Sequence, residues 1–318
     1  MFGKWMNNFY YGKSGKGDYT PENLPTNRWQ LFWEMLRVRF SALIRLNLMY
    51  MVPWLPTIIV LMIGGLSFLT TLSEAVTAAA EMSGTLVLSD LAAGIMGPML
   101  LLLVPCVAIT GPFTSGICYV TRNWARDEHA FIWSDFKDAV KENWKQSLVI
   151  SAITSLVPMM IYVCWNFYGG LASQNIIMVV PQVLTMMIGV LWCLGVTYFH
   201  PLIVCYKMRM RDVLRNGMLL AIARLPQSVG IRLLHSVPML IGVGLMLVVN
   251  PMWCVLGLMA YYVLLGFSLS RFITASYTNA VFDRYINSHI DGAMVDRGLY
   301  HPEDDEDDDE DEEAHPQA

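Results

Sequence analysis

The densest group of residues able to carry chemistry lies in a long apolar run between positions 95 and 120. Pro105 removes one backbone hydrogen-bond donor in this run, and hydroxyl and glycine residues follow it closely. The group consists of Thr110, Gly111, Pro112, Thr114, Ser115 and Gly116. Carbonyls that proline frees in a membrane helix must be satisfied by neighbouring helices, hydroxyls or water. The pattern therefore predicts either a packed kink or a polar crevice in a broken helix that binds a solute or an ion.

Ionisable side chains inside apolar runs form a second group of candidates, because even the lowest scale assigns about 2.5 to 3.5 kcal/mol to a charge at the bilayer centre. His200 and His235 fall near the ends of two such runs, and no Asp or Glu falls at the centre of any run. A proton-coupled carrier usually contains such a carboxylate. Interfacial anchoring of the two histidines is therefore favoured over a proton relay.

Signatures of catalysis are weak in this sequence. Gly12, Lys13 and Ser14 resemble the end of a phosphate-binding loop, but Asn7 stands where that motif begins with glycine. The motifs H-E-x-x-H and G-x-S-x-G are absent, and the six cysteines lie in apolar runs without a C-x-x-C pair. We therefore expect a protein that is not an enzyme and that binds no metal, cofactor or nucleic acid.

The composition identifies the environment that positions these residues. The 318 residues are 55% hydrophobic and only 15% charged, with a mean hydropathy of +0.45, which is more apolar than a soluble core requires. Six runs have the length of about 20 residues that crosses a hydrocarbon layer. They cover residues 46–66, 95–120, 147–168, 176–205, 228–249 and 251–275. The predicted fold is an all-α polytopic transmembrane helical bundle.

Basic residues predict which loops lie in the cytoplasm. All 21 Lys and Arg residues fall before the first run, between the second and third, between the fourth and fifth, after the sixth, or at the adjoining ends of these runs. The intervening segments 67–94, 169–175 and 250–251 contain none. By the positive-inside rule, we expect a multi-pass membrane protein whose two termini are both cytoplasmic.

The charge distribution also divides the chain into three parts. Residues 303–313 are all acidic, so we expect residues 287–318 to form a disordered tail that solubilises the protein, tethers a basic partner or weakly holds divalent cations. Residues 1–28 are expected to be flexible, and residues 29–286 to form the membrane domain.

Amphipathic segments and small residues predict how this domain packs. Three segments that start at Trp29, Ile132 and Met210 are predicted to be interfacial helices, which either rest on the membrane surface or form a platform for a partner. Small residues at every fourth position predict close contacts between helices within the bundle. The two stripes are Ser147, Ser151 and Ser155, and Thr185, Gly189, Cys193 and Thr197.

Several short motifs give the chain a family resemblance. The motifs that support this resemblance are L-N-L-M-Y at 46–50 with Pro53 and Pro56, T-G-P at 110–112 followed by Tyr119, Arg122 and Trp124, and the segments 135–147 and 213–226. In these motifs the chain resembles the bacterial YesL-like membrane proteins over most of residues 29–286. Two features depart from that pattern, because residues 57–109 separate motifs that the family joins more directly, and Phe113 and Ser115 replace alanine.

The resemblance implies little about function, because that family is uncharacterised. It is associated with carbohydrate ABC uptake systems. With this resemblance, our leading hypothesis is a non-enzymatic accessory or regulatory protein of the bacterial plasma membrane, whose partners are the lipid bilayer and either an ABC transporter permease or another membrane protein. The alternative is a small-solute carrier or channel with its site at the broken second span. The sequence leaves the substrate and the oligomeric state open.

Overall fold

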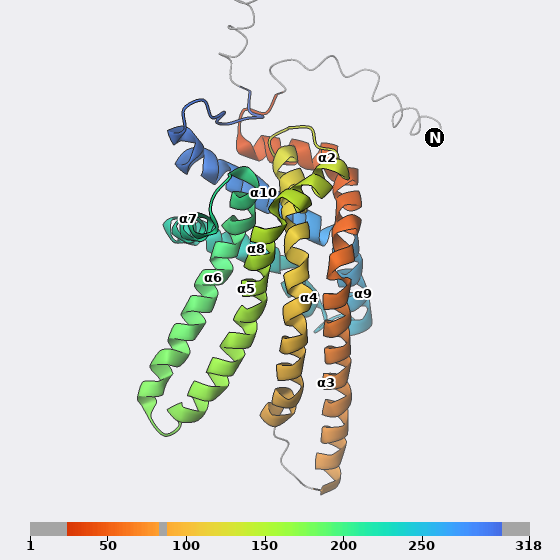
Figure 1. Cartoon of the computed structure of the whole chain (residues 1–318). Coiled ribbons are helices and arrows are strands. Elements are labelled where there is room, and N and C mark those ends of the chain that lie inside the picture. The colour runs from red at the N-terminus through yellow and green to blue at the C-terminus, as the bar shows by residue number, and fades with distance from the viewer. Residues whose placement is uncertain (1–23, 83–87, 301–318) are drawn as a thin grey trace, which may run out of the picture.

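The computed structural model describes residues 24–82 and 88–300, and all regular secondary structure in these residues is helical (Figure 1). The predicted all-α class is therefore confirmed. The elements are α2 (Arg28–Met51), η2 (Val52–Trp54), α3 (Leu55–Met82), α4 (Leu88–Trp124), α5 (Ser134–Ala172), η3 (Ile176–Met178), α6 (Val179–Cys205), α7 (Met210–Ala223), α8 (Leu225–Leu245), α9 (Pro251–Tyr261), η4 (Tyr262–Gly266), α10 (Phe267–Tyr285) and η5 (Asn287–His289). The acidic run 303–313, residues 1–23 and residues 83–87, which belong to the segment 57–109 between the two family motifs, lie outside the described residues.

Within residues 24–82 and 88–300, six helical stretches are long and apolar enough to cross a membrane, which is the predicted number. They are Arg28–Glu74, Gly94–Trp124, Ser134–Ala172, Ile176–Cys205, Leu225–Leu245 and Pro251–His289. By the length and composition of these helices, the chain is a multi-pass membrane protein.

Two of the predicted interfacial segments are continuous with a span. The segment at Trp29 forms the first turns of α2, where the Asn27 side chain caps the helix by accepting hydrogen bonds from the backbone N–H groups of Trp29 and Gln30 at 3.1 and 2.9 Å. The segment at Ile132 leads directly into α5. Only the segment at Met210 becomes a separate helix among the described residues, because Pro226 starts α8 directly after it.

The helices pack most closely at one end of the bundle. Buried residues begin at Thr110 on α4, end at Ser155 on α5 and begin at Gly189 on α6, so the interior belongs to the same end of all three helices. Figure 1 shows the hairpins α3–α4 and α5–α6 diverging toward the other end. The residues at both limits of the described chain, Pro25 and Tyr300, meet at the packed end through a hydrogen bond of 2.9 Å.

Helix α10 organises this packed end. Phe272 of α10 joins a buried cluster with Leu43 of α2 and Trp124 of α4. Phe282, three turns further along α10, joins a second cluster with Tyr198 of α6 and Val213 of α7. A π-helical turn, η4, precedes α10 and contacts α2. The last span is therefore held by helices from both halves of the chain.

Candidate functional site

The residues of the predicted polar crevice lie in the packed half of α4. Thr114 donates a hydrogen bond to the Thr110 carbonyl at 2.9 Å, so the Tyr50 hydroxyl, 2.7 Å from Thr114 Oγ1, is the donor of that second bond. The Ser115 hydroxyl lies 2.6 Å from the Ser147 hydroxyl of α5. This segment is thus joined to α2 and α5 by direct hydrogen bonds.

The glycines of this segment allow α5 to approach closely. A Cβ atom on Gly111 would lie 2.6 Å from the Ser151 hydroxyl, and one on Gly116 would lie 2.8 Å from the Phe136 ring. Both distances are too short for non-bonded atoms. Contact with α5 therefore fills this face of Thr110–Gly116, and a solute crevice in the segment stays a prediction.

The two stripes of small residues have different surroundings. Ser147, Ser151 and Ser155 are buried on α5. On α6, Gly189 packs against Ile161 and Thr197 is buried, but Thr185 is half-buried and Cys193 is exposed. A stripe of every fourth residue drifts around a helix of 3.6 residues per turn, so its members need not share one neighbour.

The two candidate histidines lie on α6 and α8. His200 is only 3% exposed, and neither of its ring nitrogens has a hydrogen-bond partner among the described residues. His235 Nε2 lies 3.3 Å from the Thr274 hydroxyl of α10. Both rings are close enough to Arg232 and Arg271 for electrostatic interaction. No group of three or more His, Cys, Asp or Glu able to hold a metal is found in the part of the chain that the structure describes.

A polar pocket of about 240 Å³ opens at the packed end of the bundle, at residues that the sequence analysis did not single out as a site. The end of α4, the loop after it, the end of α6, α10 and the segment after α10 all contribute to its wall. The lining residues are Arg122, Arg126, Cys205, Tyr206, Asn279, Phe282, Asp283, Asn287, Ala293, Met294 and Arg297.

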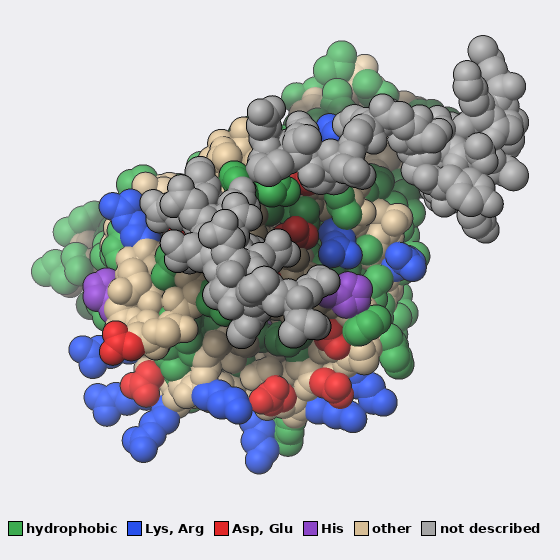
Figure 2. Space-filling view, turned by 90° about the horizontal axis from the view of Figure 1, so that it is seen from above, with side chains coloured by type: hydrophobic (Ala, Val, Ile, Leu, Met, Phe, Trp, Pro, Cys, Tyr) green, Lys and Arg blue, Asp and Glu red, His purple; other side chains and the backbone are tan. Residues whose placement is uncertain are grey.

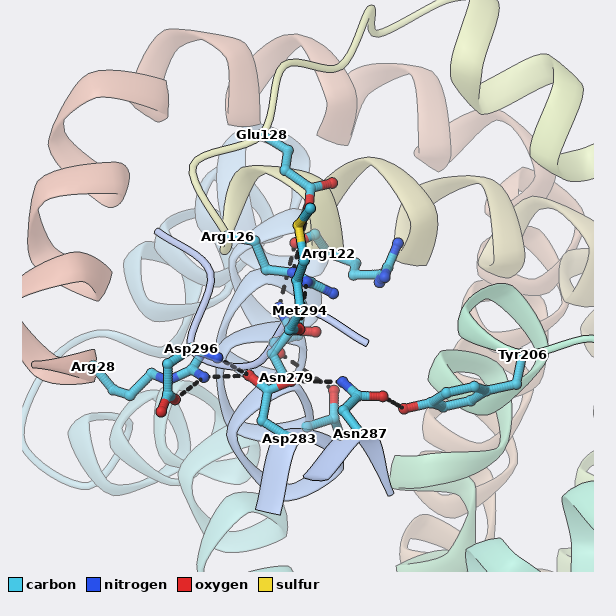
Figure 3. A network of polar contacts seen from close by, with 12 residues as sticks. Arg28, Arg122, Arg126, Glu128, Tyr206, Asn279, Asp283, Asn287, Met294 and Asp296 are labelled. Atoms are coloured by element: carbon cyan, nitrogen blue, oxygen red, sulfur yellow. Dashed lines mark hydrogen bonds and ion pairs between the residues drawn. The ribbon is translucent and has the colours of Figure 1, made fainter. Parts of the chain in front are cut away.

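A chain of hydrogen bonds fixes one wall of this pocket (Figure 3). The Tyr206 hydroxyl donates to Asn287 Oδ1 at 2.7 Å, and Asn287 Nδ2 donates to Asp283 Oδ1 at 2.6 Å. The other oxygen of Asp283 pairs with Arg28, whose guanidinium also lies 2.6 Å from Asp296. The carboxylate of Asp283, which is only 5% exposed, is thus balanced by Arg28 from the start of α2.

The opposite wall is formed by arginines. Arg126 Nε lies 3.3 Å from a Glu128 oxygen, and Arg297 Nε lies 3.3 Å from the same oxygen. The contact between Arg126 and Glu128 is an ion pair without hydrogen-bond geometry, so the Nε–H group of Arg126 is buried with no hydrogen-bond acceptor among the described residues. The Nε–H group of Arg122 is also buried without an acceptor in this part of the chain. Arg122 makes no ion pair in the same part of the chain; it is 3.4 Å from the Asn123 side-chain oxygen. Burial, and then the Arg122 charge, lower the pKa of Arg126.

The pocket therefore offers positive charge and N–H donors to whatever enters it. Tyr206 is already bonded to Asn287, and Asn279 donates a hydrogen bond to the Arg122 carbonyl, whereas the arginine side chains are not fully satisfied. An acceptor-only group fits this arrangement better than a donor. The sequence does contain a signal for this pocket. Arg122 and Arg126 are four residues apart, and Asn279, Asp283 and Asn287 follow one another at the same spacing. This spacing places each set on one side of a helical path. In the sequence the basic residues predict orientation, and Arg122 also belongs to a family motif, but neither feature indicates a binding site.

Comparison with known proteins gives a partial likeness. A protein family described as "Protein of unknown function, DUF624" matches residues 43–165, which extend from α2 to α5 and include Arg122 and Arg126 of the pocket. No curated protein and no solved structure matches the chain. Over less than half of its length, the chain is thus similar to an uncharacterised domain family.

Proposed function

We propose that this chain is a non-enzymatic accessory or regulatory membrane protein that contacts a transporter through its cytoplasmic end. The YesL-like resemblance suggests a bacterial carbohydrate uptake system of the ABC type, with its permease as the partner. Such a subunit leaves ATP hydrolysis to the transporter, which agrees with the lack of a complete nucleotide-binding motif in the sequence.

The observation that carries this proposal is a basic surface beside the packed end of the bundle. Lysines of α5 and arginines in and before α7 are exposed there, and they outnumber the exposed acidic residues among them, which are Asp138, Glu142 and Asp212. The basic residues are Lys137, Lys141, Lys145, Arg209, Arg211 and Arg215. Gln146 of α5 donates a hydrogen bond of 2.8 Å to the Met208 carbonyl and so holds the two groups side by side. Figure 2 shows a row of Lys and Arg side chains along one edge of this end.

Helix α7 presents this surface rigidly. Its Val213, Leu220 and Ala221 are buried, and Gly217 allows the ring of Phe199 on α6 to contact the helix backbone. Leu219 and Ile222 remain exposed beside the arginines. A fixed helix that exposes both charge and apolar area is suited to a protein surface that is acidic around an apolar centre.

Site-specific crosslinking tests the proposal. A photoreactive amino acid at Arg211 or Lys141, in cells that express a carbohydrate ABC transporter, should capture its permease, and the complex should co-purify. The same amino acid at Leu69, an exposed position of α3, is the control and should capture none. The proposal is rejected if both basic positions capture no transporter subunit and the purified chain alone moves a carbohydrate into liposomes.

A further inference from the structure

The charges around the polar pocket do not cancel. Four arginines, Arg28, Arg122, Arg126 and Arg297, face three carboxylates, those of Glu128, Asp283 and Asp296. Glu128 is shared by two of these arginines, and the two aspartates share Arg28. The remaining positive charge belongs to Arg122, which has no carboxylate partner among the described residues.

The unsatisfied donors of the pocket belong to the same arginines. The Arg126 side chain is 9% exposed, lines the pocket, and keeps one N–H group without an acceptor, as Arg122 does. A buried donor without an acceptor is unfavourable, and a charged one is more so. The structure thus leaves positive charge and free donors at one wall of a preformed space, which is how sites for anions are built.

The type and number of donors indicate the kind of anion. Guanidinium groups present paired N–H donors that match the oxygens of a phosphate or carboxylate. A phosphate group directs its oxygens tetrahedrally and can therefore accept from two or three guanidiniums that approach from different sides. Arg122 lies in the last turn of α4 and Arg126 in the loop after it, whereas Arg297 approaches from the segment after α10. This arrangement favours a phosphate over a planar carboxylate.

We propose that the pocket formed by Arg122, Arg126 and Arg297 is a binding site for a phosphate group. At about 240 Å³ the pocket is smaller than the roughly 300 to 1,000 Å³ of sites for drug-sized ligands, so the group belongs to a small ligand or is the exposed part of a larger one. Two sources share this chemistry, a soluble phosphate compound and the headgroup of an anionic lipid. Because the site does not involve α7, the proposal does not depend on the accessory function.

Thermal unfolding of the purified full chain in a neutral detergent tests this site. Three probes are compared at equal ionic strength, namely inorganic phosphate, dioctanoyl phosphatidic acid and acetate. Phosphate or the phosphatidic acid should raise the midpoint of unfolding in a saturable manner, and acetate should not. Stabilisation by inorganic phosphate identifies a soluble source, and stabilisation by phosphatidic acid alone identifies a lipid headgroup. An equal effect of acetate, or no saturable effect of either phosphate probe, overturns the proposal.

Two matched substitutions locate the site. Arg122→Gln removes a guanidinium that has no ion pair, so the fold should persist. Phosphate should bind to this variant at least about tenfold more weakly than to the unmodified chain. Arg209→Gln removes the same charge from an exposed position outside the pocket and should leave binding unchanged. Equal weakening by both variants would mean that only the general charge of the surface attracts the probe, and would also overturn the proposal. Because the three-probe comparison uses the unmodified chain, it remains decisive even if Arg122→Gln does not fold.

Discussion

The side chain of Asn47 in α2 accepts a hydrogen bond of 2.8 Å from the backbone N–H of Ser268 in α10. Its amide nitrogen donates to the carbonyls of Tyr262 and Val263, at 2.9 and 2.7 Å. These groups belong to or follow the π-helical turn η4, where the regular hydrogen-bond pattern of the last span is interrupted. One fully buried amide thus satisfies three backbone groups of another helix.

Replacement of Asn47 by leucine should therefore destabilise the protein strongly. Leucine has a similar size but removes the side-chain hydrogen-bond partner of two carbonyls and one N–H, and a buried group that is left unsatisfied costs about 1 to 3 kcal/mol. We expect a loss of at least about 2 kcal/mol in unfolding free energy, measured by denaturation in mixed micelles. Asn166→Leu is the control, because Asn166 is exposed and bonds only to the Tyr162 carbonyl of its own helix. Equal losses in the two variants would contradict the role of Asn47.

Gly111→Ala should also lower stability, because the new methyl group would meet the backbone and side chains of α5 at Ser147 and Ser151. Separation of α4 and α5 should cost about 1 to 3 kcal/mol. Gly65→Ala is the matched control, since a Cβ atom on Gly65 in α3 meets no atom within 4 Å. Thermal unfolding of both variants should show a decrease for Gly111→Ala alone. An unchanged midpoint in Gly111→Ala would show that the two helices are not in close contact.

The pair of Arg28 and Asp283 should show strong energetic coupling. Arg28→Gln leaves the carboxylate of Asp283 buried without its cation, so we expect the unfolding free energy to fall by about 3 kcal/mol. This value is at the lower end of the range for buried pairs because the Arg28 side chain is 25% exposed. The double variant Arg28→Gln with Asp283→Asn should recover part of this loss. A double-mutant cycle measures the coupling, and Arg37→Gln, at an exposed position of α2, should have little effect. Additive losses would rule out the pair.

The predicted orientation can be tested at the two ends of one helix. Ser134 and Ser173 are both exposed and lie at the start of α5 and directly after it. In a cysteine-free background, Ser173→Cys should react with a membrane-impermeant maleimide in intact cells. Ser134→Cys should react only after lysis, because the basic residues near it are predicted to remain in the cytoplasm. The reverse labelling pattern would place both termini outside.

The class of fold and the number of spans could be predicted from sequence because hydropathy and helix length are local properties. The ends of the helices were harder to predict. No proline or glycine separates the amphipathic residues at Trp29 from the apolar residues that follow Leu46, so one continuous helix forms where two were expected. Residues 287–300 were assigned to the tail, yet Asp296 and Arg297 form ion pairs with the bundle.

The spacing of Arg122 and Arg126 indicates one wall of the polar pocket, but the pocket as a whole could not be predicted because its walls come from segments far apart in the chain. Arg122 and Asp283 are separated by more than half of the sequence, and no local pattern indicates that they share a pocket. The segment Thr110–Gly116 had the opposite character. Its composition of proline, glycine and hydroxyl residues can be recognised in the local sequence. Whether its hydroxyls face a solute or a neighbouring helix depends on how α2 and α5 pack, and the sequence of the segment does not determine that packing.

The contact between Arg28 and Asp283 has a consequence for biogenesis. Arg28 leaves the ribosome long before Asp283 and Asp296, which emerge only after the last span has been synthesised. The packed end of the bundle can therefore be completed only after the last span has been synthesised. A chain that stalls before α10 would lack both carboxylate partners of Arg28 and the Phe272 ring of the first buried cluster.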